Sequence, residues 1–491
     1  MIQKKKKEAA EAVVRPPPHL PQPEVPAGLA RLAPISHDHE EHRLIQWSAS
    51  AQSPSIIDVA SIGRFLGASS IGFGVFNVVV KGSGGSEGQC TYKQGLNPRP
   101  HSVTITEFGA VGDGETLNSV AFQTPFNLTS HLTLFLEKGA VIIGTQESSQ
   151  WPIVDPLPSY GQGIDLPGGR HRSLINGHNL TDVVITGNNG VIDGQGSIWW
   201  EWFRSRKLNY SRPHLVEFTD SQDIVISNLS FLNSPAWSIH PVYCSNVIVQ
   251  NITIQTSPDS PFTDGIVPDS SSNMCIEDCS ISVGHDAIAL KSGWDGYGIS
   301  YARPTTEIQI TKVALQSAAG AALAFGSEMS GGISDVRAEQ LYIYDSSTGV
   351  SFRTTLGRGG FVEKTVISNS VLENVREAIR FDGHSGGHPD DHYDPSEIPI
   401  IRKITLKSIV GSNISVAGNF SGIENDPFTA LCLSDLNFTV NSDPSSSWSC
   451  SDVSGYSELV FPEPCSQLQS PSTNSSTCFA LDDHYNALAV A

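Results

Sequence analysis

Two aspartates, Asp264 and Asp286, have the residue type and spacing in this 491-residue chain that most directly suggest chemistry. Each lies in a turn-like segment, Thr263–Gly265 (TDG) or Gly284–Ala287 (GHDA), beside short apolar runs that resemble strands. If such runs stack as the coils of a β-solenoid, a spacing of about one coil places both carboxylates on one surface. Two facing carboxylates are the catalytic groups of glycoside hydrolysis. The alternative is that both are ordinary turn residues, because Asp is favoured in turns.

The remaining sequence is typical of such a solenoid. Gly is abundant and charged residues make up only 16% of the chain, which suits many tight turns and few amphipathic helices. Short β-branched runs recur at intervals of roughly 20 to 40 residues, often with Asn or Gly between them. These runs are Val183–Ile185, Ile224–Ile226, Val247–Val249, Ile308–Ile310 and Val366–Ile367. A sandwich of antiparallel hairpins is the competing all-β architecture, but it predicts denser hairpin signals. We therefore favour the solenoid.

Several long segments carry a resemblance to a known family. They are Ile105–Gly114 (ITEFGAVGDG), Gly190–Trp200 (GVIDGQGSIWW), Phe231–Asn246 (FLNSPAWSIHPVYCSN), Thr263–Asn273 (TDGIVPDSSSN), Cys275–Thr305 (CIEDCSISVGHDAIALKSGWDGYGISYARPT), Phe325–Ile333 (FGSEMSGGI) and Thr355–Val362 (TLGRGGFV). In content and order they resemble plant polygalacturonase-like proteins of glycoside hydrolase family 28, over roughly Val103 to Cys465. The resemblance implies an all-β fold, a single-stranded right-handed parallel β-helix, that cuts pectin backbones.

The resemblance also implies roles for the two aspartates. In the family pattern, an Asn-Thr-Asp motif supplies one carboxylate and a Gly-Asp-Asp motif supplies two more. This chain has Phe262-Thr263-Asp264 and Gly284-His285-Asp286, so Asp264 and Asp286 match the family's water-activating aspartates. His285 stands at the position of the family's general acid. An inverting glycosidase needs both an acid for the leaving oxygen and a base for the attacking water.

His285 is open to two interpretations. An imidazolium between two carboxylates has a raised pKa, so His285 would replace the aspartate as the proton donor at a mildly acidic pH. Alternatively, His285 binds substrate or only packs in its turn. In that case Glu328, in the segment GSEMSGG, supplies the proton or only orders its Gly-rich loop.

Two further family motifs concern substrate binding. The Gly-His-Gly motif aligns best with Gly320-Ala321-Ala322, and the Arg-Ile-Lys motif with Ser351-Phe352-Arg353. One basic residue therefore persists, as Arg353, and a guanidinium can grip a uronate carboxylate bidentately. We expect Lys291, Arg353 and Glu328 to contact the substrate.

The net charge of −20 argues against nucleic acid and anionic membranes as partners, because the overall field repels both. A polyanionic pectic substrate then requires local positive charge in the cleft. The candidates are Lys291, Arg303, Arg353 and Arg358, although Arg303 and Arg358 fit an ordinary solvated role equally well.

Cysteine usage indicates an oxidising compartment. The eight cysteines lack zinc-ligand spacing, and four of them fall in the last 60 residues, so we expect disulfides. Sequons for N-glycosylation support secretion; they are Asn127, Asn179, Asn209, Asn228, Asn251, Asn413, Asn419, Asn437 and Asn474. We expect a secreted, monomeric cell-wall glycoprotein.

The N-terminal part departs from the family. We expect residues 1–88 to form a disordered extension containing a displaced, signal-like apolar segment at 65–80. Residues 89–470 form the β-helix and 471–491 a C-terminal tail. Near 123–126 the resemblance implies that roughly 25 to 30 residues are absent. Such residues would cap the open end of the solenoid, so its stability is in question.

The segment Gly383–Asp394 (GHSGGHPDDHYD) has a metal-like composition. Its Gly and Pro residues favour a solvated loop, and we expect no metal and no cofactor. The implied reaction is inverting hydrolysis of α-1,4-galacturonosyl links in pectin. One alternative is a catalytically impaired β-helix that only binds wall polysaccharide. A second alternative is calcium-dependent pectate lyase chemistry, which the motifs resemble less.

Overall fold

The computed structural model describes residues 125–441, 443, 447–469, 478 and 479, which belong to one compact unit. The predictions for the extension 1–88, the apolar segment 65–80 and most of the tail 471–491 lie outside these residues. The first part of the expected 89–470 domain lies outside them as well.

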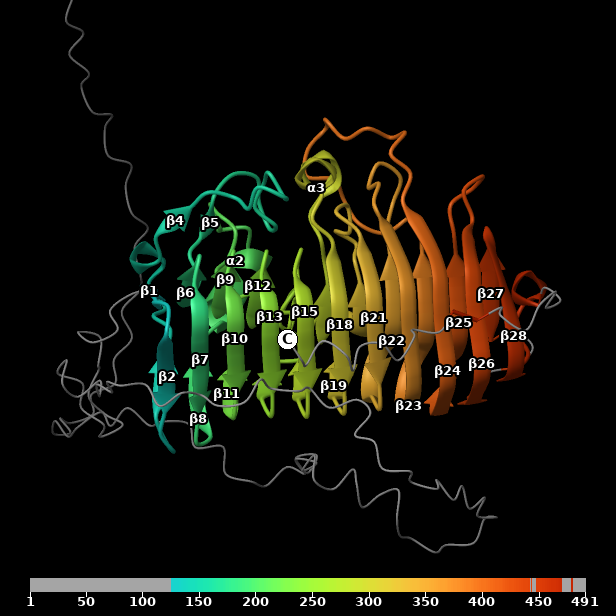
Figure 1. Ribbon diagram of the computed structural model, residues 1–491, viewed down its shortest axis with the longest axis horizontal. Helices are drawn as coiled ribbons and strands as arrows, with labels where there is room; N and C mark the ends of the chain where they lie inside the picture. The colour runs from blue at the N-terminus through green and yellow to red at the C-terminus, as the bar shows by residue number, and fades with distance from the viewer. Residues whose placement is uncertain (1–124, 442, 444–446, 470–477, 480–491) are drawn as a thin grey trace, which may run out of the picture. The chain divides into compact units, whose positions relative to one another are not determined.

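The described chain winds into a parallel β-helix whose coils follow one another in sequence order (Figure 1). One sheet has four strands: β1 (Phe126–Asn127), β6 (Ile175–His178), β9 (Val216–Thr219) and β12 (Ile239–Val242). The other sheet has 22 strands: β2 (Leu132–Leu136), β3 (Val141–Ile143), β7 (Thr181–Gly187), β8 (Gly190–Asp193), β10 (Gln222–Ser227), β11 (Leu229–Leu232), β13 (Ser245–Gln250), β14 (Thr253–Gln255), β15 (Ser272–Glu277), β16 (Ser280–Val283), β17 (Ile288–Leu290), β18 (Thr305–Thr311), β19 (Ala314–Ser317), β20 (Ala321–Phe325), β21 (Ile333–Glu339), β22 (Tyr342–Arg353), β23 (Phe361–Asp382), β24 (Ile400–Ile414), β25 (Val416–Ser421), β26 (Phe428–Val440), β27 (Trp448–Ser451) and β28 (Val453–Phe461).

Few elements interrupt the coils. The short helices are α2 (Ser197–Arg204), α3 (Asp295–Tyr301), η4 (Ser148–Gln150) and η6 (Ser466–Leu468). The strands β4 (Ile153–Val154) and β5 (Arg170–His171) form a small antiparallel pair beside the solenoid.

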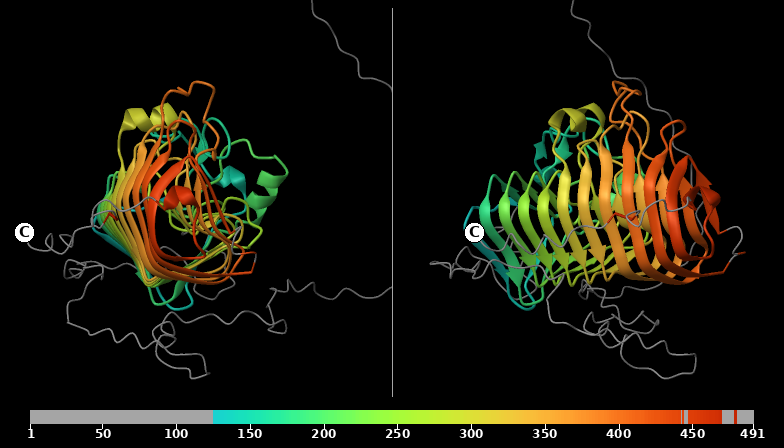
Figure 2. Two further views of the ribbon diagram at one scale, coloured as in Figure 1. Left: turned by 90° about the vertical axis from the view of Figure 1, so that its right-hand side faces the viewer. Right: turned by 45° about the vertical axis from the view of Figure 1, so that its right-hand side comes forward.

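The β-branched runs stack in register, one coil above the next. Val183 pairs with Ile224, which pairs with Val247, and the same column continues through Ile308. Because inward side chains of successive coils lie about 4.8 Å apart, each run buries its apolar atoms against the next. The right-handed parallel β-helix predicted by the sequence is thereby confirmed, and Figure 2 shows its stacked coils from two further directions.

Asparagines at the corners explain how each coil turns. Asn228 and Asn251 adopt φ values of 56° and 50°, a left-handed conformation that Asn tolerates better than most residues. The Asn251 side-chain amide donates a hydrogen bond of 2.7 Å to the Asn228 side-chain carbonyl one coil earlier. The corners are therefore tied together along the solenoid.

The interior contains an aromatic ladder. The rings of Phe325, Phe352 and Phe381 stack in turn with 4.4 Å between centroids, and Phe420 follows at 4.6 Å. All four side chains are buried. This apolar column continues underneath the surface that carries the candidate site.

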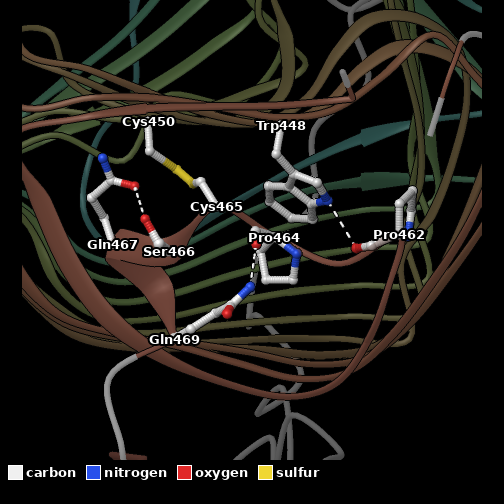
Figure 3. The surroundings of a disulfide bond; sticks show 8 residues. All are labelled: Trp448, Cys450, Pro462, Pro464, Cys465, Ser466, Gln467 and Gln469. Atoms are coloured by element: carbon white, nitrogen blue, oxygen red, sulfur yellow. Dashed lines mark hydrogen bonds between the residues drawn. A yellow bond between two sulfur atoms is a disulfide. The ribbon is translucent and has the colours of Figure 1, made fainter. Parts of the chain in front are cut away.

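Disulfides close the C-terminal end, as the cysteine pattern predicted. Cys450 bonds Cys465 beside the Trp448 indole, whose N–H donates to the Pro462 carbonyl at 2.9 Å (Figure 3). Cys432 bonds Cys478. Cys275 is also disulfide-bonded, whereas Cys244 and Cys279 are buried free thiols. Among the described residues, no helix is both long and apolar enough to span a membrane.

Replacing Cys450 and Cys465 together with alanine is expected to lower the free energy of unfolding by about 3 kcal/mol. The bond closes a short loop, 15 residues in sequence separation, and removes entropy from the unfolded chain. Removing Cys432 and Cys478, which are 46 residues apart, should cost more, about 4 kcal/mol. Urea unfolding of both double variants measures the two losses, and equal stability of all three proteins would contradict the prediction.

The first described coil exposes apolar side chains. Phe135, Val141 and Ile143 are 52%, 49% and 55% exposed in β2 and β3. The prediction that this end lacks part of its cap concerns the residues before 125, so it stays a prediction.

Candidate active site

Strand register brings Asp264 and Asp286 onto adjacent coils. Ile266 pairs with Ile288, and each aspartate precedes its isoleucine by two residues. The backbone N–H of Asp286 donates to Asp264 Oδ1 at 3.0 Å. Both side chains are almost completely buried, at 2% and 0% exposure. The predicted placement of the two carboxylates on one surface therefore agrees with the geometry.

His285 lies between the two carboxylates. Its Nδ1 donates to Asp264 Oδ1 at 2.7 Å and lies 3.6 Å from Asp286 Oδ2. Burial alone would lower the pKa of His285, but the charges of Asp286 and Asp264 outweigh it and raise the pKa above its ordinary value. The imidazole is one-fifth exposed, so its free edge reaches the solvent side of the site.

Asp286 is held as an anion by its neighbours. Its Oδ2 accepts a hydrogen bond from the Arg353 guanidinium, and its Oδ1 accepts one from the Ala321 backbone N–H at 2.8 Å. Burial opposes ionisation, yet Arg353, followed by His285 and Lys291, lowers the pKa of Asp286 to about 2. A Cβ atom at Gly320 would collide with Asp286 Oδ1, which explains why this position carries no side chain.

Lys291 and Glu328 form a second buried ion pair next to the first. Burial favours the neutral acid, but Lys291 and then Arg358 lower the pKa of Glu328 well below its ordinary value. A carboxylate held ionised in this way is a poor proton donor. The ion pair with Lys291 therefore argues against Glu328 as a proton donor.

Arg303 and Arg358 do not reach the site. The Arg358 side chain is fully buried and pairs with Asp295. Arg303 donates to the Tyr243 carbonyl at 2.7 Å, and it is not among the residues that line the cavity. Of the four basic candidates, only Lys291 and Arg353 remain.

These groups line a cavity of about 560 Å³. Among its lining residues are four basic side chains and four acidic ones: Arg170, Arg212, Lys291, Arg353, Asp165, Asp264, Asp286 and Glu328. The local positive charge expected in the cleft is present, but four acidic side chains accompany the four basic ones. These eight side chains balance in charge, and six of them form three ion pairs with one another. The cavity is nevertheless far less acidic than the chain as a whole.

Sequence reasoning missed part of the lining. The Trp237 ring stacks on His214, with 4.6 Å between centroids, and Lys291 Nζ lies 5.4 Å from the Trp237 ring. Trp237 falls within one of the segments that resemble the family, so the sequence could have indicated that it lies at the site. Arg212 lies outside every such segment and gave none.

Two groups of described residues have metal-like composition: Asp264 with His285 and Asp286, and the set His214, Glu217 and His240. An arginine side chain already lies beside each group. Arg353 pairs with Asp286 in the first group, and Arg170 lies 2.6 Å from Glu217 in the second. We therefore propose no metal at either group.

The predicted loop Gly383–Asp394 gathers no metal ligands among the described residues either. Its side chains bind different partners: His388 Nδ1 lies 2.6 Å from Asp295, and Asp390 accepts a hydrogen bond from Tyr297. The loop packs beside α3, as Figure 1 shows in orange and yellow. Its polar side chains therefore bind the loop to α3.

The stability contributed by the carboxylates with lowered pKa values and the histidines with raised pKa values is expected to peak between about pH 4.5 and 6.5, and buried His214, whose pKa burial lowers, offsets part of it as the pH falls. Asp286, Glu328 and Glu217 have lowered pKa values, so their contribution is present above about pH 4 and is lost as the pH falls. His285 and His240 have raised pKa values in the folded protein. Their contribution to stability is therefore complete below about pH 6.5 and is lost as the pH rises through those raised pKa values. Thermal unfolding from pH 2.5 to 8 measures this profile, and a melting temperature constant across that range would refute it.

Comparison with known proteins gives a consistent family assignment. Residues 164–463 match the model of the family "Glycosyl hydrolases family 28". The chain is 45% identical over 400 residues to a Vitis vinifera protein named "Probable polygalacturonase", covering 76% of this chain and 82% of the relative. It is 23% identical over 370 residues to polygalacturonase-2 of Solanum lycopersicum, covering 72% and 78%.

Solved structures agree. An exopolygalacturonase from Thermotoga maritima superposes with a TM-score of 0.60 at 26% identity, covering 69% of this chain and 87% of that one. A polygalacturonase from Erwinia carotovora gives a TM-score of 0.56 at 23% identity, covering 68% and 85%, and supports the fold. The β-helix, the paired aspartates and these matches lead to one conclusion: the chain belongs to glycoside hydrolase family 28, the family of polygalacturonases.

Proposed function

We propose that the chain hydrolyses the α-1,4-galacturonosyl linkages of pectin with inversion of configuration. The observation that carries the proposal is the group formed by Asp264, His285 and Asp286 in a cavity that also presents Lys291 and Arg353. Acid, base and uronate-binding groups thus lie in one place. Family membership supplies the substrate class.

His285 acts as the general acid. Its raised pKa keeps the imidazole protonated at the mildly acidic pH of a cell wall. Because Nδ1–H is bound to Asp264, Nε2–H is the proton available to the leaving glycosidic oxygen. After transfer, the neutral ring keeps Nδ1–H on Asp264, which holds its orientation.

Asp264 and Asp286 position and deprotonate the attacking water. Asp286 is ionised throughout the physiological range, since its pKa is about 2. One side-chain nitrogen or oxygen atom from each of Asp264, His285 and Asp286 lies within 4.8 Å of the other two, closer than the separation of about 6.5–9.5 Å usual between the carboxyl groups of inverting enzymes. The use of Nε2, on the far side of the ring from Nδ1, lengthens the effective separation between acid and base.

Arg353 and Lys291 hold the uronate carboxylates of the substrate. Each is paired within the protein, with Asp286 and Glu328 respectively, so each cation is already oriented. Glu328 serves this binding by fixing Lys291, and Arg353 adds the fork geometry that suits a carboxylate.

Product analysis tests the reaction type. Polygalacturonate is incubated with the protein in two parallel reactions, one with added calcium and one with a calcium chelator, and proton NMR follows the anomer of the first product. Inverting hydrolysis predicts β-configured reducing ends from α-links and no product absorbing in the ultraviolet. An ultraviolet-absorbing, calcium-dependent product would instead establish lyase chemistry, and α-configured first products would establish retention.

One observation favours a second function, that of a wall-polysaccharide-binding protein with little or no turnover. Asp286, the proposed base, is neutralised by Arg353, and a low pKa makes it a weak base. Binding of polygalacturonate without any release of reducing ends would support this reading. We further propose a secreted monomer, in keeping with the disulfides of the C-terminal coils.

A further inference from the structure

We propose that the substrate groove is closed at its N-terminal end and open at its C-terminal end, so that the protein acts on a free end of the polyuronate chain. The inference rests on the proposed hydrolase activity and adds to it a mode of action. The closing element is the loop 155–169, named the arch below, which connects β4 to β5. Figure 1 shows it as the teal loop that extends from these strands toward α3.

A buried ion pair clamps the arch across the groove. Asp165 of the arch accepts hydrogen bonds of 2.8 and 2.9 Å from the Arg212 guanidinium, whose side chain is fully buried. The same guanidinium donates to the carbonyls of Pro235 and Pro261, at 3.0 and 2.8 Å, on the next two coils. The Phe203 ring, from α2, covers it at 4.3 Å. Arg212 therefore joins the arch to the segments of the next two coils that contain Pro235 and Pro261.

The arch also lies directly on the floor of the groove. Ile164 packs against Ala236 and Trp237 of the sheet surface. Ser211 Oγ accepts hydrogen bonds from the backbone N–H groups of Asp165 and Leu166, at 3.0 and 3.1 Å. The arch thus covers the floor with direct packing and leaves no passage for a polysaccharide beneath it.

A second set of buried contacts holds the base of the arch. The Tyr160 hydroxyl donates to Asp269 at 2.5 Å, and the hydroxyl groups of Ser159 and Tyr243 lie 2.6 Å apart. The Trp294 backbone N–H, at the start of α3, donates to the Ser159 carbonyl at 2.8 Å. Because these groups are buried and satisfied, the arch is a fixed wall.

The other side of the site is covered only in part. Residues 385–388 of the loop 383–394 also line the cavity, and the Gly387 carbonyl accepts hydrogen bonds from Trp294 Nε1 at 3.0 Å and from Arg358 at 2.8 Å. His240 pairs in register with Glu217, and both outward-facing side chains are buried, at 0% and 5% exposure. Beyond the site, Ser351 pairs with Arg380, whose side chain is 37% exposed, and Arg380 pairs with half-buried Asn419. These two positions of the C-terminal coils are therefore partly accessible to solvent, unlike His240 and Glu217.

The wall stands one coil away from the catalytic group. The carbonyl of Asp264 accepts a hydrogen bond from the Ser238 backbone N–H at 2.9 Å, so the Trp237 coil and the Asp264 coil are direct neighbours. Adjacent coils are about 4.8 Å apart. A wall so close to the carboxylates limits how much of the substrate lies on this side of the site, and the expected product is a mono- or diuronate.

The size of the first products tests the inference. With a galacturonate hexamer and with the polymer, we expect mono- or diuronate from the earliest time point and a slow fall in viscosity for each reducing end released. Intermediate oligomers at early times, with a rapid fall in viscosity, would overturn the inference while leaving the hydrolase activity intact.

Asp165→Asn weakens the clamp while preserving its shape, and it is expected to produce intermediate oligomers. Asp155→Asn is the matched control, because Asp155 is an exposed carboxylate of the same loop and should leave the product sizes unchanged. If Asp165→Asn does not fold, the wild-type product profile still decides the question. If neither the wild type nor a folded Asp165→Asn protein releases intermediate oligomers, the ion pair between Asp165 and Arg212 is not what sets the product size.

Binding gives a readout that does not need turnover. Asp286→Asn is titrated with short and long oligogalacturonates at equal total uronate. A groove with one closed end predicts that saturation follows the molar concentration of chain ends. Saturation that follows total uronate would overturn the inference, and an absence of both binding and hydrolysis would overturn the proposed function with it.

Discussion

Asp286→Asn is expected to lower the rate of polygalacturonate hydrolysis by about 10²- to 10⁴-fold, the range typical of losing a general base. The amide keeps the size of the side chain and its hydrogen bond from the Ala321 backbone N–H, but it can no longer accept a proton from water. It also removes the negative charge that orients Arg353 and raises the pKa of His285. Initial rates of reducing-end release measure the loss.

Asp335→Asn provides the matched control. Asp335 is a partly buried aspartate of β21 whose carboxylate lies 3.8 Å from Lys364, and it is not among the residues lining the cavity. The control is expected to retain wild-type activity. Circular dichroism and melting temperatures establish that both variants are folded. Wild-type activity in folded Asp286→Asn would remove Asp286 from the mechanism.

His285→Ala is expected to lower the maximal rate by about 10²- to 10³-fold, because the leaving oxygen then departs without a proton donor. In the wild-type protein, His285 must be protonated to act. Its pKa is raised by Asp286 and Asp264 against the effect of burial, so activity should persist above the ordinary histidine range and fall as the pH rises through that raised pKa. The pH dependence of kcat measures this alkaline limb.

His285→Asp separates a catalytic role from a packing role. Aspartate is the residue that the family pattern places here, so the variant should keep much of its activity with the alkaline limb moved to lower pH, because the ordinary pKa of Asp is about 3.9. A packing role predicts equal loss in both variants and no movement of the limb. Full activity in His285→Ala would return the search for the acid to other groups in the cavity.

The fold was predictable because its information is local and repeated. Runs such as Val183–Ile185 and Ile224–Ile226 recur with the coil period, and each stacks on the next in register. The same regularity placed Asp264 and Asp286 on adjacent coils, since each precedes a paired isoleucine by the same two residues. Short-range sequence patterns therefore predicted that the two carboxylates lie together, whereas their roles and that of His285 were implied only by the family resemblance.

Contacts between distant loops were not predictable in the same way. Arg212 and Asp165 are 47 residues apart in sequence, in segments without a repeating pattern, and only the folded arch brings them together. Arg358 is the opposite case. Its sequence context made it a candidate for the cleft, but its side chain is buried and pairs with Asp295 instead. The pairing of each basic residue depends on tertiary packing, so the charge balance of the cavity could not be foreseen.

The most direct test of the account is the initial rate of reducing-end release from polygalacturonate at about pH 5, with wild-type protein and Asp286→Asn side by side. The proposed mechanism predicts sustained release by the wild type and loss of nearly all of it in the variant. A well-folded wild-type protein that binds the polymer but releases no reducing ends would contradict it, and would identify the chain as a polysaccharide-binding member of its family.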